Sequence, residues 1–110
     1  MLTDKNLLRK MREQVLKLYS AEVQLAFEKE QDESKKKAFL NQRQYYDNYL
    51  HELEKHNLES LLARMKPLEI ELSRAITSLD NALKRVNNTV NIISNIQMIS
   101  SIIARIITIV

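Results

Sequence analysis

Both histidines of the chain stand in residues 51–56, HELEKH, where the candidate metal ligands gather. The segment is similar to the H-E-x-x-H motif of zinc enzymes, but the second histidine comes one position too late. On a regular helix His51 and His56 therefore point in different directions and do not share one metal ion. Glu52 and His56 have the i,i+4 spacing of a surface pair. We expect a solvated helix face here, and no metal or other cofactor.

A cluster of aromatic residues precedes the histidines. Phe39, Tyr45, Tyr46 and Tyr49 lie close together in sequence, with Arg43 between them. Aromatic and basic side chains in this arrangement can stack on nucleic-acid bases. The same spacing is also typical of a core layer whose phenol oxygens reach the surface. We favour the core layer and expect Tyr45 to be its most exposed member.

The composition excludes several classes of chemistry. The chain of 110 residues has no glycine, no cysteine and one proline. Glycine-rich phosphate loops and nucleophile elbows need glycine, and thiolate chemistry needs cysteine. Tight turns also depend on glycine and proline, so strand-rich folds are disfavoured and few loops remain to carry a catalytic site. We therefore predict a protein that is not an enzyme and has no small-molecule substrate.

The charges are mixed rather than segregated by sign. Seventeen basic and 14 acidic residues give a net charge of +3. The basic cluster at residues 35–37 directly follows an acidic segment at residues 28–33, which neutralises much of its field. Nucleic-acid binding is therefore not expected. The N-terminal residues have scattered charges and no apolar signal segment, which predicts a cytoplasmic protein.

The first half of the chain has the apolar spacing of amphipathic helices. Apolar residues recur seven apart from Met11 through Leu18 and Leu25, and again from Phe39 through Leu53. Residues 28–37 contain no apolar side chain and leave two alternatives open. They form either a polar turn near 32–34 or a continuous solvent-crossing helix supported by i,i+4 ion pairs.

The clearest boundary lies at Pro67. Cations precede it, and Glu69 and Glu71 follow in the first turn of the next helix, where acidic residues suit the helix dipole. From residue 68 to residue 110 apolar residues recur three and four apart, which predicts one long helix. Asn87 and Asn88 favour a kink or a fresh start near Thr89, because asparagine suits helix ends better than helix interiors.

The C-terminal segment, residues 86–110, is the most distinctive part of the sequence. It has no acidic residue, and most of its helical circumference is apolar. Such a helix is buried by its own chain, by another subunit or by a membrane. Arg105 opposes the membrane alternative, since a central arginine costs about 2.5–3.5 kcal/mol on insertion scales. The predicted interface residues are Ile92, Ile93, Ile96, Ile99, Ile103, Ile106, Ile107 and Val110.

Together these patterns predict one all-α domain spanning 1–110. The expected helices cover about 4–31, 36–65 and 68–110, and the first two are either separate or continuous. Their packing is expected to be a three-helix bundle, with two- and four-helix bundles or an antiparallel coiled coil as alternatives. The expected function is a non-enzymatic assembly protein that uses its C-terminal helix to bind a second copy or another helical protein. The alternative is a membrane-active or tail-anchored helical protein that inserts the same helix.

Overall fold

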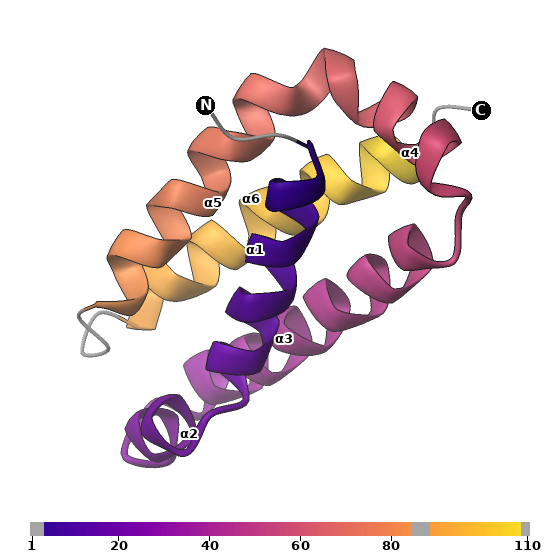
Figure 1. Cartoon of the computed structure of the whole chain (residues 1–110). Helices are drawn as coiled ribbons and strands as arrows, with labels where there is room; N and C mark the ends of the chain where they lie inside the picture. Colours follow the sequence, from indigo (N-terminus) through magenta and orange to yellow (C-terminus); the bar gives the residue numbers. More distant parts are fainter. Residues whose placement is uncertain (1–3, 85–88, 109–110) are drawn as a thin grey trace.

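Every regular element among residues 4–84 and 89–108, which the computed structural model describes, is a helix (Figure 1). The prediction of an all-α fold is therefore confirmed. In chain order the elements are α1 (Asp4–Leu18), α2 (Ala21–Glu28), α3 (Glu33–Glu54), α4 (Leu58–Met65), the 3₁₀ helix η1 (Lys66–Leu68), α5 (Glu69–Leu83) and α6 (Thr89–Thr108).

Side-chain caps explain why the first half divides into separate helices. Ser20, Asp32 and Asn57 each accept a backbone N–H bond at the start of the helix that follows. The turn alternative for residues 28–37 is correct, because α2 ends at Glu28 and α3 begins at Glu33. The uninterrupted helices expected over 4–31 and 36–65 are each divided in two. A helix can end at a capping serine, aspartate or asparagine without any glycine. The heptad spacing of apolar residues continues past such a cap, so the spacing alone does not reveal these breaks.

The boundary at Pro67 is found as expected, but the helix after it is not continuous. Pro67 lies in η1, and Glu69 and Glu71 occupy the first turn of α5. The single helix predicted over 68–110 is divided into α5 and α6, and α6 makes its fresh start at Thr89; Asn87 and Asn88 lie outside the described residues. Antiparallel α5 and α6 bury apolar surface that one extended helix would expose to water (Figure 1).

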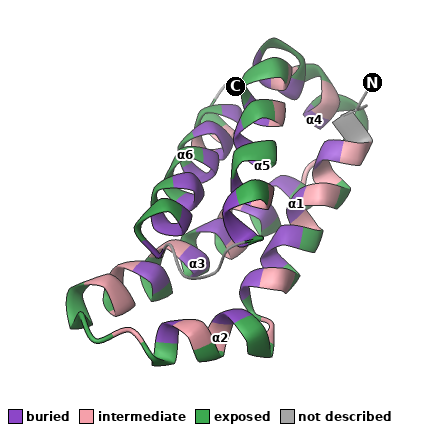
Figure 2. Cartoon of the chain, turned by 90° about the vertical axis from the view of Figure 1, so that its left-hand side faces the viewer, coloured by how far each residue is buried: buried purple, intermediate pink, exposed green. Residues whose placement is uncertain are grey.

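Three long helices lie side by side and the first helix lies across two of them. α6 packs between α3 and α5, running parallel to α3 and antiparallel to α5, and α1 contacts both α3 and α5 (Figure 1). The short helix α2 packs at the end of the molecule against α1 and the first half of α3 (Figure 2). The chain measures 43 × 26 × 20 Å along its principal axes.

The core is formed largely by the apolar faces that meet α6. Phe39 and Phe27 stack with ring centroids 3.5 Å apart and join α2 to α3. Tyr46 and Leu50 of α3 are fully buried, as is Leu72 of α5. Burying one such large apolar side chain contributes about 1.5–3 kcal/mol. This burial outweighs the poor helix propensity of the β-branched isoleucines in α6.

Candidate functional site

The structure buries most of the predicted interface residues within their own chain. Six are at most 9% exposed: Ile92, Ile93, Ile96, Ile99, Ile103 and Ile106. Ile107 is half-buried against the core, and Val110 lies outside the described residues. These side chains fill the space between α3 and α5, so any surface that α6 offers to a partner is its opposite side.

That opposite side forms a continuous exposed strip along the helix. We call it the α6 outer face; its exposed residues are Val90, Asn91, Ser94, Gln97, Met98, Ser101, Arg105 and Thr108. None of them before Arg105 is charged, although 28% of the whole chain is charged. Val90 and Met98 are 56% and 51% exposed, so apolar surface is available between the amides and hydroxyls.

Polar interactions join both ends of α6 to neighbouring parts of the chain, and another lies within the helix itself. Arg105 pairs with Glu71 of α5 at 2.9 Å, and Thr89 donates to Glu30 at 3.3 Å. Asn95 is 8% exposed and its amide donates to the backbone oxygen of Asn91 at 2.7 Å. The single charge of the α6 outer face is therefore already neutralised.

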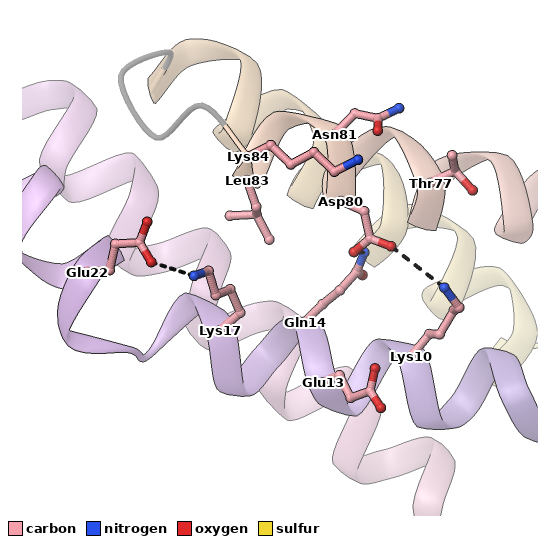
Figure 3. Close-up of a pocket in the computed structure, with 10 residues that line it drawn as sticks. All are labelled: Lys10, Glu13, Gln14, Lys17, Glu22, Thr77, Asp80, Asn81, Leu83 and Lys84. Carbon is pink, nitrogen blue, oxygen red and sulfur yellow. Dashed lines mark hydrogen bonds and ion pairs between the residues drawn. The ribbon is translucent and has the colours of Figure 1, made fainter.

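A groove of about 600 Å³ lies between α1 and α5 (Figure 3). Its three basic side chains are balanced by three acidic ones, Glu13, Glu22 and Asp80. Two of the basic side chains form ion pairs, Lys10 with Asp80 and Lys17 with Glu22. Lys84 extends from the end of α5 over the groove (Figure 3). Balanced charges of this kind favour neither an anion nor a cation as ligand.

The floor of the α1–α5 groove is a polar network centred on Gln14. This side chain is 3% exposed, and its amide donates to the backbone oxygen of Ile76 at 2.7 Å and to Asp80 at 2.8 Å. Its oxygen accepts a 2.7 Å bond from the hydroxyl of Tyr46. The network joins α1, α3 and α5. The amide nitrogen and the amide oxygen of Gln14 both have hydrogen-bond partners, as a buried polar group requires.

Burial raises the pKa of the Tyr46 phenol well above its usual value near 10, and the negative charge of Asp80 raises it further. Arg12 has a smaller opposite effect. The phenol therefore stays neutral as a hydrogen-bond donor. This inward position differs from the expected core layer with surface-reaching hydroxyls, whereas the prediction that Tyr45 is exposed is confirmed at 49% exposure.

A second buried polar group, Arg43, holds the junction of α1 and α2. It is 9% exposed and donates to the backbone oxygen of Leu18 at 3.2 Å and to the side chain of Gln24 at 2.7 Å. Its guanidinium lies 4.3 Å from the ring centroid of Tyr19 and 5.0 Å from that of Phe39. Arg43 thus satisfies an end carbonyl of α1 and stacks between aromatic rings.

The histidine segment does not form a cluster of ligands. His51 is exposed on α3 and lies 4.0 Å from Glu54, while His56 follows the end of that helix. Glu52 pairs with Lys55 at 3.1 Å rather than with His56. Within the described part of the chain, no three His, Cys, Asp or Glu side chains are grouped so that they could hold a metal ion.

Sequence reasoning missed Gln14 and Arg43, although both carry a signal. Each polar residue falls within an apolar stripe, Gln14 beside Met11 and Val15, and Arg43 between Phe39 and Tyr46. A polar residue at a core position is a candidate for a buried hydrogen-bond network.

Two further findings bear on function. Among the described helices, α6 is long and apolar enough to cross a membrane, a property that core helices of soluble proteins share. Comparisons with known protein families, with curated proteins and with solved structures found no match.

Proposed function

We propose that this protein is a non-enzymatic interaction module that binds a helical partner on the α6 outer face. The observation that carries the proposal is the absence of charge from Val90 to Ser101 on an exposed helix surface. Charged groups are expensive to remove from water, and the cores of protein interfaces are depleted of them. Removing a face of amides, hydroxyls and the exposed Met98 from water costs less free energy than removing a charged face.

Other exposed helix surfaces of the chain differ from this one. α1 exposes Arg9, α3 exposes Lys37 and α4 exposes Glu59. α6 has 20 residues and is about 30 Å long, which gives a partner helix several turns to contact. The methionine adds a flexible apolar side chain that adapts to the shape of a partner.

The first partner to test is a second copy of this chain. Two α6 outer faces brought together place no like charges opposite each other before Arg105, which is already paired with Glu71. Antiparallel pairing of the two helices would also separate the two Arg105 side chains. Isologous contacts of this kind are the commonest way in which soluble chains form dimers.

Light scattering or sedimentation of the purified full chain over a range of concentrations tests the proposal. We expect the mass to rise from 12.9 kDa toward that of two chains. Met98→Glu should weaken this association more than about tenfold, because it buries two unpaired carboxylates at the contact. Ile70→Glu is the matched control, since Ile70 is an exposed apolar residue of α5 at 70% exposure.

A mass of one chain at every concentration would refute self-association through α6. Equal weakening by Met98→Glu and Ile70→Glu would instead show that the contact lies elsewhere. Circular dichroism of both variants establishes that the helices remain folded, so that a change in mass reports the contact.

A second candidate function is insertion of α6 into a membrane, which its length and composition support. The isoleucines would then exchange their contacts with α3 and α5 for contacts with lipid. Liposome flotation tests this function: wild-type chain should float with vesicles, and Arg105→Leu should increase the floating fraction by removing the charge that opposes insertion. Wild-type chain that stays at the bottom of the gradient would exclude this function.

A further inference from the structure

A smaller groove lies between α1 and the start of α4, on a different part of the molecule from the α6 outer face. Its volume is about 360 Å³, and Leu8, Leu58 and Leu61 provide its apolar lining. Leu61 is 2% exposed, whereas Leu58 is 44% exposed. Small-molecule sites have volumes of about 300–1,000 Å³ and mostly apolar walls with a few polar groups. We call this feature the α1–α4 groove.

The α1–α4 groove has a positive charge that no described carboxylate pairs with. Arg12 is already paired with Glu54 and with Asp47. Arg9 also lines the groove, and no carboxylate of the described residues lies within ion-pair distance of it. An unpaired guanidinium beside apolar side chains complements a ligand with one anionic end and a hydrocarbon body.

Two neighbouring features increase the attraction for an anion. His56 lines the same groove and can donate a hydrogen bond from its ring. The groove also faces Leu58, the first residue of α4, where the helix dipole presents its positive end. Two backbone N–H groups at this helix end already have partners in Asn57. The N–H of Ser60 donates to the Asn57 side chain, and the N–H of Leu61 donates to the Asn57 backbone oxygen.

We propose that the α1–α4 groove binds a single-chain aliphatic carboxylate, such as a medium-chain fatty acid. The hydrocarbon lies against Leu8, Leu58 and Leu61, and the carboxylate accepts hydrogen bonds from the guanidinium of Arg9. A guanidinium presents two parallel N–H groups to a carboxylate, which gives direction as well as charge to the contact. This role is independent of the α6 outer face and of any partner bound there.

The dimensions of the groove favour a small ligand over a segment of another protein. Stable protein interfaces use about 20–30 residues on each partner, whereas seven described residues line this groove. The residues next to it on α1 also oppose a large apolar contact, because Arg9 is exposed and Glu13 follows one turn later. A chain that enters only the groove avoids covering these charges.

Titration calorimetry of the full chain with decanoate, below the concentration at which decanoate aggregates, tests the proposal. We expect saturable binding of one decanoate per chain. Arg9→Gln should weaken it about tenfold or more, because a charge-assisted contact becomes a neutral one. Decanol should bind more weakly than decanoate to the wild-type chain, and equally to the wild type and Arg9→Gln. The control Arg74→Gln removes another exposed arginine, on α5, and should leave decanoate binding unchanged.

A second variant addresses the apolar wall. Leu58→Glu places a carboxylate in the groove at the first position of α4, where acidic residues suit the helix dipole, so the fold should be retained. Decanoate binding should fall at least tenfold, with an unchanged circular dichroism spectrum. Absence of saturable binding to the wild type would overturn the proposal, as would equal weakening by Arg9→Gln and Arg74→Gln or unchanged binding to Leu58→Glu.

Discussion

The hydrogen bond between Tyr46 and Gln14 can be removed from either end, by Tyr46→Phe or by Gln14→Leu. Both side chains are buried, at 0% and 3% exposure, and the bond is 2.7 Å long. Each single substitution leaves one buried polar atom without its partner, and such an atom costs about 1–3 kcal/mol. We expect each single variant to lose this amount of unfolding free energy.

The double variant should behave differently. It replaces both partners with apolar groups of similar shape, which is close to neutral. The other groups that Gln14 contacts do not become stranded, because Asp80 has a side chain 41% exposed to water and the oxygen of Ile76 lies within α5. Because each single loss is about 1–3 kcal/mol and the double variant is close to neutral, the loss in the double variant should be about 2–6 kcal/mol smaller than the sum of the two single losses.

Urea unfolding followed by far-ultraviolet circular dichroism measures these free energies. Slopes of about 1–3 kcal/mol per molar urea are typical of small proteins, so each single substitution should lower the midpoint by about 1 M. The slope itself should stay constant across the four proteins. Additivity within about 0.5 kcal/mol would refute the reasoning, because it would mean that neither atom depends on the other.

Three further outcomes are expected from the same urea assay. Between pH 10 and 12 the wild type should lose stability that Tyr46→Phe does not lose, because the raised pKa of the Tyr46 phenol means that the unfolded chain releases its proton first; identical pH profiles would count against this. Arg43→Lys should cost about 1–2 kcal/mol despite keeping the charge, since lysine replaces neither the stacking on Tyr19 nor the hydrogen-bonding geometry; a lysine variant as stable as wild type would show that charge alone matters. Ile103→Ala should cost about 2–5 kcal/mol by opening a cavity at a fully buried site, against a loss below about 1 kcal/mol for Val90→Ala on the α6 outer face.

Local chemistry in the sequence was enough to place some boundaries. Pro67 with Glu69 and Glu71 marks the start of α5, because each residue suits that position through its own backbone or charge. The breaks at Ser20 and Asn57 were missed, since one capping side chain is enough to end a helix while the apolar spacing continues past it. Such residues also occur inside helices, so residue type alone does not identify the cap.

The surroundings of the isoleucine-rich segment could not be derived from spacing. Its pattern predicts burial on most sides, but a neighbouring helix, a second chain and a membrane all satisfy that pattern equally. The structure supplies α3 and α5 as the neighbours of α6, which depends on contacts between residues far apart in sequence. Ile96 and Ile99 are buried inside the chain, and their predicted role in binding a partner stays a prediction. The surface of α6 that a partner can reach is its exposed side.

The position of α6 in the chain sets the order in which the core can assemble during translation. This helix completes the contacts of α3 and α5 and is made after every other described helix. At about 5–20 residues per second, ribosomes need roughly one to five seconds to progress from residue 84 to residue 108. Until α6 has been added, the chain lacks the helix that covers the apolar faces of α3 and α5. A chain that stops before Thr89 should therefore be captured by chaperones or aggregate, whatever the local stability of its first five helices.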